Sequence, residues 1–294
     1  MSLSAATGEA LQQAGLDAAY VEDLARRTVA EDLAGGVDVT STATVPAALA
    51  GTAAFVPRAA GVVAGLGVAM AVLDVVGPVD LGATADGRRV EPGETVLTAR
   101  GPVRTLLTAE RSALNLLCHL SGIATATRTW VDAVAGTGAR IRDTRKTTPG
   151  LRALEKYAVR AGGGANHRMS LSDAALVKDN HVVAAGGVAA AFSAVRAAFP
   201  GLPVEVECDT VEQVREVLDA GADLVLLDNM ALPDLRTCAE LCRSRGVLTE
   251  ASGGLSLQVA RTVAETGVDF LAVGALTHSA PVLDLGVDLT LGEG

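Results

Sequence analysis

The sequence predicts an α/β protein in which a small N-terminal α+β sandwich-like domain precedes an incomplete α/β barrel of six or seven strands. From Ala139 onward, short β-branched segments alternate with helical patterns. Residues 220–230 (AGADLVLLDNM) also align with 266–276 (TGVDFLAVGAL) as a weak internal βα repeat. Eight such units need ~250 residues, and a chain of 294 residues leaves too little after Ala139 for a complete barrel.

The N-terminal part combines helical and strand patterns. Residues 16–33 have the spacing of an amphipathic helix, and 65–76 form an apolar helical run. Gly and Pro turn signals separate strands expected near 52–57, 79–84 and 95–100. A long helical pattern covers 103–120 and resumes to 135, with Gly122 expected as a break.

Six strands are expected in the barrel, each followed by a helix of about ten to fifteen residues. They lie near 139–143, 174–178, 203–208, 223–228, 247–251 and 268–273. The predicted boundary divides an N-terminal domain, 1–110, from the barrel, 111–279. A return of the tail 280–294 to the first domain is left open.

Composition narrows the function classes. The net charge is −10 and the isoelectric point is about 4.9, which argues against a nucleic-acid partner. The first ten residues carry no basic segment, and the longest apolar runs fall short of the ~18 residues of a membrane span. The four cysteines lie in apolar segments, which favours a buried core over a metal site and a reducing cytoplasm as the compartment.

Basic residues concentrate between Ala139 and His181, in a protein that is otherwise acidic. The stretch 142–150 (RDTRKTTPG) is the densest part, and the three lysines of the chain, Lys146, Lys156 and Lys178, all lie in this region. A solvated charged surface and a site for an anionic ligand explain the charge equally well. The placement of the lysines favours the anion site, because elsewhere the chain uses only arginine as its cation.

In an α/β barrel the ligand lies at the carboxyl ends of the strands. Those ends carry charged or glycine-rich segments, namely 143–146 (DTRK), 178–180 (KDN), Glu207, 228–229 (DN), 250–254 (EASGG) and 273–275 (VGA). Ser252, Gly253 and Gly254, with Val273, Gly274 and Ala275, form a predicted phosphate cup, because glycine lets backbone N–H groups approach an anion.

Several of these segments also carry a family resemblance. The segments are 31–41 (EDL…DVTS), 110–125 (ERSALNLLCHLSGIAT), 143–181 (DTRKTTPG through LVKDNH), 204–207 (VEVE), 225–230 (VLLDNM), 250–255 (EASGGL) and 272–279 (AVGALTHS). With them the sequence resembles the type II phosphoribosyltransferases, most closely the quinolinate phosphoribosyltransferases. The resemblance covers nearly the whole chain.

The resemblance implies a reaction and a set of site residues. Quinolinate and phosphoribosyl pyrophosphate would give nicotinate mononucleotide, pyrophosphate and carbon dioxide, with Mg²⁺ as cofactor. By position in the family pattern, Arg145, Arg168, His167 and Lys178 would hold the quinolinate carboxylates, with Thr144 and Lys146 near the ligand anions. Glu207 and Asp228 would face the ribose and the substrate-bound Mg²⁺, and with Lys178 they form the expected catalytic group.

Arg111 is a further candidate. Leu107, Arg111, Leu114 and Cys118 follow helical spacing, which places an arginine within an otherwise apolar face. A buried arginine needs an internal carboxylate or an anionic ligand as partner. The resemblance implies the second, with Arg111 reaching across the interface of a homodimer into the neighbouring site.

Three alternatives remain open. A related phosphoribosyltransferase could act on another base, and Lys178 at a strand end is compatible with a Schiff-base phosphosugar aldolase. A non-catalytic module that binds a phosphometabolite could use the same phosphate cup. The polar neighbours of Lys178, Asp179 and His181, argue against the aldolase, because a nucleophilic lysine prefers apolar surroundings.

Overall fold

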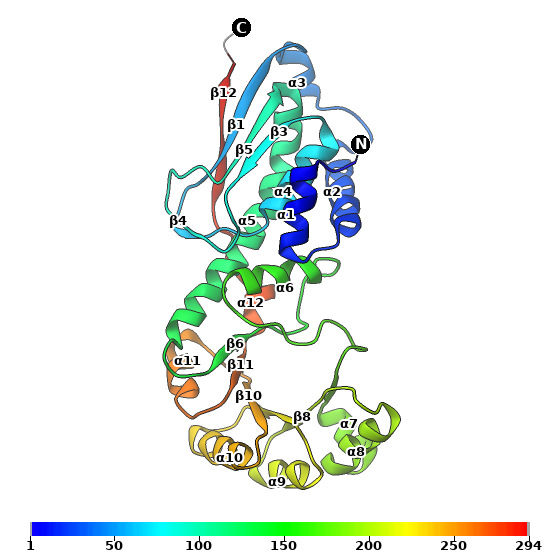
Figure 1. Ribbon diagram of the computed structural model, residues 1–294, viewed down its shortest axis with the longest axis vertical. Helices are drawn as coiled ribbons and strands as arrows, with labels where there is room; N and C mark the ends of the chain where they lie inside the picture. The colour runs from blue at the N-terminus through cyan, green and yellow to red at the C-terminus, as the bar shows by residue number, and fades with distance from the viewer. Residues whose placement is uncertain (1, 293–294) are drawn as a thin grey trace. The chain divides into compact units, whose positions relative to one another are not determined.

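The structure is a computed structural model that describes residues 2–292 (Figure 1). Within that range the chain divides into two compact units. One contains residues up to 126 together with 153–163 and the segment from 279 onward, and the other contains 127–152 and 164–278. The sequence placed one boundary at residue 110, whereas the first unit includes most of the long helix α5 (Val103–Ala133) and takes in helix α6 (Arg152–Ala161).

The first unit is built on a four-stranded antiparallel sheet with strand order β12-β1-β5-β3. Its strands are β1 (Ala50–Pro57), β3 (Asp80–Ala83), β5 (Leu97–Pro102) and β12 (Leu285–Leu291), and β2 (Gly61–Val62) pairs separately with β4 (Arg89–Val90). The three predicted strands are therefore confirmed. The C-terminal segment pairs along β1, from Gly51 opposite Leu291 to Pro57 opposite Leu285.

The helices of the first unit pack around an apolar centre. They are α1 (Ala5–Ala14), α2 (Ala18–Leu33), α3 (Val39–Thr44), α4 (Leu66–Val76), α6 and the first part of α5. Helix α4 is buried over Leu66–Asp74, and both α1 and α2 pack against it. Asp17 caps the N-terminus of α2 by accepting a hydrogen bond from the Ala19 N–H, as is typical of aspartate at that position.

Gly122 does not break the long helix as expected, because α5 continues through it. A Cβ at this position would overlap the carbonyl oxygen of Pro281 and lie 2.8 Å from Val282 Cα. The glycine is thus required by the close approach of the 281–282 backbone to the helix, which is a tertiary cause that helix propensity does not reveal.

The second unit contains a six-stranded parallel sheet with strand order β6-β11-β10-β9-β8-β7. Its strands are β6 (Arg140–Arg142), β7 (Ala175–Val177), β8 (Val204–Cys208), β9 (Leu224–Asp228), β10 (Leu248–Ser252) and β11 (Phe270–Ala272). All six predicted strands are present. No strand pairing joins β6 to β7 among residues 2–292, so the expected incomplete barrel is confirmed.

Helices follow the strands of this unit, but several are shorter than expected. They are α7 (Asp179–Ala185), α8 (Val188–Ala198), α9 (Val211–Asp219), α10 (Leu232–Ser244), α11 (Leu257–Ala264) and α12 (Ala275–His278). Of these six, α8 and α10 have the expected length, as does α6, which follows β6 along the chain but belongs to the first unit. Helix α9 begins with a capping box, in which Thr210 and Gln213 each accept a hydrogen bond from the other's backbone N–H.

Within the described residues, no single helix combines the length and apolar character needed to cross a membrane. Asp179–Ala185 and Val188–Ala198 reach those limits only when counted as one segment, and the two helices meet at a bend of 88°.

Candidate functional site

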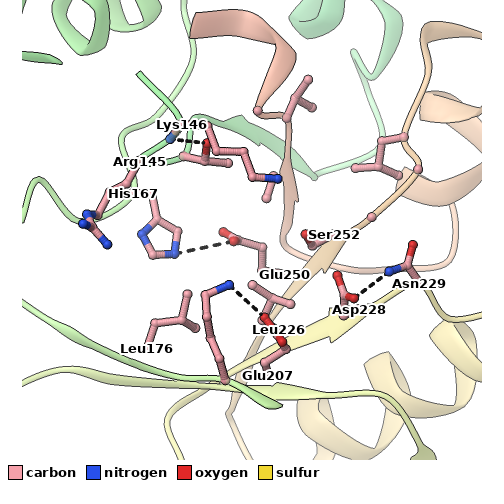
Figure 2. Close-up of a pocket in the computed structure, with 18 of the residues that line it drawn as sticks. Arg145, Lys146, His167, Leu176, Glu207, Leu226, Asp228, Asn229, Glu250 and Ser252 are labelled. Carbon is pink, nitrogen blue, oxygen red and sulfur yellow. Dashed lines mark hydrogen bonds and ion pairs between the residues drawn. The ribbon is translucent and has the colours of Figure 1, made fainter. Parts of the chain in front are cut away.

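A cavity of about 780 Å³ lies at the carboxyl ends of the parallel strands (Figure 2). Apart from Arg111, every predicted site residue lines it, namely Thr144, Arg145, Lys146, His167, Arg168, Lys178, Glu207, Asp228, Ser252, Gly253, Gly254, Val273, Gly274 and Ala275. These residues come from six strand ends and the loops that follow them. The cavity collects them because parallel strands present their carboxyl ends on one side of the sheet.

Two arginines form the cationic side of the cavity. The Nε atom of Arg145 is buried and has no hydrogen-bond partner among residues 2–292. Arg168 donates from Nη1 to the Ala174 carbonyl at 2.8 Å. Burial, and then the like charge of Arg145, lowers the pKa of the Arg168 guanidinium. Two partly buried cations therefore lie close enough to repel, and an anion between them would relieve that repulsion.

The loops that carry these arginines are held by polar contacts, of which those of Asp143 are the more buried. The Asp143 side chain is fully buried, and its carboxylate accepts hydrogen bonds from the His167 N–H, at 2.8 Å, and from the Asn166 amide. Arg152 donates to Thr147 Oγ1 at 3.0 Å and to the Met169 carbonyl at 3.1 Å. The segment after β6 is thus tied to the segment around residue 169, which fixes where both arginines emerge.

The carboxylates of Glu207 and Asp228, at the carboxyl ends of β8 and β9, lie on another side of the cavity (Figure 2). Lys178 Nζ lies 3.1 Å from Glu207 Oε2, and the Lys178 side chain is 49% exposed. Asn229 donates its side-chain amide to Asp228 Oδ2 at 2.6 Å and its backbone N–H to the Ser252 carbonyl at 2.9 Å. A lysine that is half exposed and ion-paired is unlike the desolvated nucleophile of a Schiff-base enzyme.

The glycine-rich segments form the third side. Gly253 and Gly254 have φ angles of 89° and 59°, which other residues rarely adopt. A Cβ at Gly253 would overlap the Asn229 amide, so the sharp turn also depends on that side chain. A Cβ at Gly274 would lie 3.1 Å from Lys146 Cδ. Glycine at both positions leaves backbone groups accessible from the cavity, as a phosphate site requires.

Beneath the cavity lies a buried polar cluster that the sequence did not single out. Arg142 Nη1 is 2.8 Å from Glu250 Oε2 and 3.9 Å from Glu205 Oε1, and His167 Nε2 is 2.6 Å from Glu205 Oε2. Glu250 had been noted only as part of a strand end. The alternation Val204-Glu205-Val206-Glu207 was the available signal, because residues two apart on a strand point to the same face.

Arg111 differs from its predicted environment. It is exposed on α5, and its side chain makes no hydrogen bond or ion pair among the described residues. The buried stripe of the helix includes Leu106, Ala109, Ala113 and Leu117, which is rotated from the stripe expected around Arg111. The expectation of a buried arginine was wrong, because Leu107 and Cys118 are only half-buried.

The basic residues between Ala139 and His181 do not all lie in one place, because some belong to the first unit and others to the cavity. Lys156 is fully buried on α6, in the first unit, and Arg160 donates to the Ala14 carbonyl there at 3.1 Å. These two cations therefore do not belong to the anion site. Lys146 and Lys178 do line the cavity, so two of the three lysines lie where an anionic ligand is expected.

Comparison with known proteins identifies relatives along most of the chain. Residues 38–121 match the model of the quinolinate phosphoribosyl transferase N-terminal domain, and 123–288 match that of the C-terminal domain. A carboxylating nicotinate-nucleotide pyrophosphorylase of Mycobacterium leprae (strain TN) is 55% identical over 273 residues, which are 91% of this chain and 96% of the relative. A human protein of the same name is 43% identical over 71% of this chain and 72% of its own length.

Solved structures that resemble this fold carry names from the same family as these relatives. The crystal structure of NadC from Streptococcus pyogenes superposes with a TM-score of 0.90 and 38% identity, covering 95% of this chain and 99% of that one. The nicotinate-nucleotide pyrophosphorylase of Francisella tularensis gives a TM-score of 0.88 and 35% identity, over 92% and 96% of the two chains.

Proposed function

The chain belongs to the quinolinate phosphoribosyltransferase family, and we propose that it transfers the phosphoribosyl group of phosphoribosyl pyrophosphate to quinolinate with decarboxylation. The products are nicotinate mononucleotide, pyrophosphate and carbon dioxide, a step of NAD biosynthesis. The Mycobacterium leprae relative, a carboxylating nicotinate-nucleotide pyrophosphorylase, matches the chain over both of its units.

The observation that supports the substrate assignment best is that the guanidiniums of Arg145 and Arg168 lie close to each other in the cavity. Quinolinate has carboxylates on neighbouring ring carbons, so it presents two negative charges side by side. Arg145 offers a buried Nε–H, and the like charges of the two guanidiniums are compensated by a dianion. Lys178, on the next strand end, provides a third cation for the same ligand.

The phosphoribosyl end fits the remaining two sides of the cavity. The turn at Gly253 and Gly254 and the backbone at Gly274 suit the 5'-phosphate, and Lys146 packs against Gly274 beside them. Glu207 and Asp228 face the ribose, where their negative charge stabilises the positive charge that develops at C1 as pyrophosphate leaves. The pyridine nitrogen then bonds to C1, the quaternised ring stabilises the electron pair left at C2 by loss of the 2-carboxylate as carbon dioxide, and C2 takes up a proton from solvent.

Mg²⁺ is part of the proposal. Glu207 and Asp228 lie at the ends of neighbouring strands and both line the cavity, where the Glu207 side chain is 13% exposed. Carboxylate oxygens are the ligands that Mg²⁺ prefers. They would hold it indirectly, through the substrate to which it is bound. When bound, Mg²⁺ would neutralise part of the negative charge on the departing pyrophosphate.

We also propose that the enzyme is a cytoplasmic homodimer in which Arg111 of the partner subunit completes each site. Two observations support this. All four cysteines are free, as expected in a reducing compartment. Arg111 is exposed and makes no ion pair among residues 2–292, so its guanidinium is available to another chain.

The test is product release from quinolinate and phosphoribosyl pyrophosphate with Mg²⁺. Stoichiometric carbon dioxide and pyrophosphate support the proposal, because neither an aldolase nor a binding module gives both. Nicotinate serves as the control base. Equal turnover of nicotinate would contradict the assignment to a dicarboxylate, and absence of both products would contradict the transferase itself.

A further inference from the structure

The buried cluster beneath the cavity consists of Arg142, His167, Glu205 and Glu250. It draws on β6, β8, β10 and the loop that carries Arg168. The side chains of His167, Glu205 and Glu250 are 7%, 4% and 0% exposed. Burying such groups is costly without hydrogen bonds, and Glu205 Oε1 and Glu250 Oε1 have none among residues 2–292. The contacts made by the other carboxylate oxygens and by the ring nitrogens therefore constrain where the protons of the cluster lie.

The two ring nitrogens of His167 have different partners. Nδ1 accepts a hydrogen bond from the Arg168 backbone N–H at 2.7 Å, so it must present a lone pair. The proton is then on Nε2, which lies 2.6 Å from Glu205 Oε2. The contacts therefore select the neutral Nε2–H tautomer, since an imidazolium would place an N–H against the N–H of Arg168.

The same contacts argue against a metal ion here. His167, Glu205 and Glu250 each place one ligand atom within 4.8 Å of the others, which is close enough for a shared cation. Coordination through Nε2 would move the histidine proton to Nδ1, which faces the backbone donor. Arg142 already supplies the positive charge, 2.8 Å from Glu250.

The charges in the cluster agree with a neutral histidine. Glu205 and Glu250 share the single guanidinium of Arg142, with buried Asp143 nearby. Burial, and then the charge of Glu205, raises the pKa of Glu250 to about 8. One proton is thus retained on Glu250 at neutral pH, and Glu205 remains the acceptor for His167.

His167 also separates two cavities. It lines the cavity at the carboxyl ends of the strands and a second cavity of about 420 Å³. Glu205 and Arg142 also line the second cavity. The rest of the second cavity comes from the amino ends of strands, at Ala175, Val204 and Leu224. The His167–Glu205 pair is therefore the wall between the substrate side of the barrel and its opposite end.

We propose, given the transferase function above, that Glu205 is a positioning residue for the reaction. It holds His167 as a neutral imidazole whose only N–H points into the barrel, so the ring closes the floor of the cavity. The substrate carboxylates are then bound by Arg145, Arg168 and Lys178, and His167 contributes shape to that site but neither charge nor an N–H. This differs from the role expected for His167 from the sequence.

The experiment compares two substitutions of Glu205. Glu205→Gln keeps an oxygen that can accept the Nε2–H, whereas Glu205→Leu leaves that N–H buried without a partner. We expect Glu205→Gln to stay within about threefold of the native KM for quinolinate, and Glu205→Leu to raise it at least about tenfold. The KM for phosphoribosyl pyrophosphate should change less than about twofold in both, because the phosphate cup is elsewhere in the cavity. Glu216→Leu, on the exposed face of α9, is the matched control.

Nuclear magnetic resonance of ¹⁵N-histidine protein reads the tautomer directly. The chain has 4 histidines, so a His167→Gln variant assigns the signal of His167. We expect the Nε2–H form in the native protein and in Glu205→Gln, and its loss in Glu205→Leu. This readout does not need turnover, so it separates failure of this inference from failure of the proposed function.

Three results would contradict the proposed role of Glu205. An imidazolium or an Nδ1–H tautomer in the native protein overturns the proposal even if Glu205→Leu does not fold. Native kinetics in a folded Glu205→Leu variant would also overturn it. A tenfold loss in Glu205→Gln with the tautomer intact would show that the charge of Glu205, and not its acceptor, is what matters.

Discussion

Lys178 Nζ lies 3.1 Å from Glu207 Oε2, which joins a cation at the end of β7 to a carboxylate at the end of the neighbouring strand β8. Because the lysine is half exposed, this ion pair contributes less than about 1 kcal/mol to folding stability. Its importance lies in placing opposite charges at the point where a dicarboxylate and a ribose cation would meet.

We therefore predict that Lys178→Ala lowers kcat/KM at least about a hundredfold while the melting temperature changes little. Steady-state kinetics and calorimetry would measure the two effects. Borohydride treatment with a phosphosugar provides the comparison with an aldolase, because a Schiff base on Lys178 would be trapped as a stable adduct detectable by mass spectrometry. A trapped adduct would contradict the transferase mechanism.

Arg145→Lys should weaken quinolinate binding by about 2–4 kcal/mol, because lysine cannot reproduce the bidentate geometry of a guanidinium. Titration calorimetry measures the affinity, and thermal unfolding should be nearly unchanged. Arg215→Lys on the exposed face of α9 is the control. If the Arg145 variant binds quinolinate as the native protein does, Arg145 does not bind the quinolinate carboxylates.

Gly253→Val should raise the KM for phosphoribosyl pyrophosphate more than the KM for quinolinate. The Cβ would overlap the Asn229 amide and narrow the backbone approach to the phosphate, in a residue whose φ is 89°. Gly221→Val separates strain from crowding, since Gly221 has φ +88° but no atom within 4 Å of the added Cβ. An equal rise in both KM values would indicate general misfolding.

Glu250 predicts a pH dependence of stability. Its pKa is raised from the ordinary 4.5 to about 8 by burial and then by Glu205, so the folded protein binds one more proton than the unfolded chain between these values. The free energy of unfolding contributed by this group therefore falls as the pH rises through that window. His167 lies 3.7 Å from this carboxylate and Arg142 2.8 Å, and Asp143 also acts on it.

Glu250→Gln has no such titration. Denaturant unfolding at several pH values should show the variant gaining stability relative to the native protein as the pH rises from about 5 to 8. Glu216→Gln, which is exposed, should keep the native slope. Parallel curves for the native protein and Glu250→Gln would show that Glu250 ionises normally in the folded state.

The sequence was most informative where local pattern and burial coincide. The barrel strands are short β-branched segments bounded by turn residues, and their ends gather at one side by topology alone, so the cavity residues could be predicted. The contact of His167 with Glu205 could not, because it depends on the register of Leu176 opposite Glu205 and on a loop conformation. Gly122 was misinterpreted for a similar reason, since its partner is 159 residues away in Pro281.

Arg111 shows the limit of periodicity more clearly. Helical spacing placed it on an apolar face, yet the core-facing stripe of α5 is rotated and leaves Arg111 exposed. An exposed arginine has no need of a partner in its own chain, so its expected role rests on the family resemblance and on the proposed homodimer.

Complementation tests that role. If each site takes Lys178 from one chain and Arg111 from the partner subunit, Arg111→Ala and Lys178→Ala homodimers should both be nearly inactive. A mixed dimer has one site with both substitutions and one with neither. Random assembly makes half of the dimers mixed, so a co-refolded equal mixture should recover roughly a quarter of native activity in a closed two-fold dimer.

The control is Arg111→Ala co-refolded with Arg145→Ala, which should also recover activity, whereas Lys178→Ala with Arg145→Ala should not. Lys178 and Arg145 line the same cavity of one chain, so no mixed dimer of that pair contains an intact site. Subunit exchange is verified by mass spectrometry of differently tagged chains. If exchanged Arg111→Ala and Lys178→Ala subunits remain folded, dimeric and inactive together, Arg111 does not act across the interface.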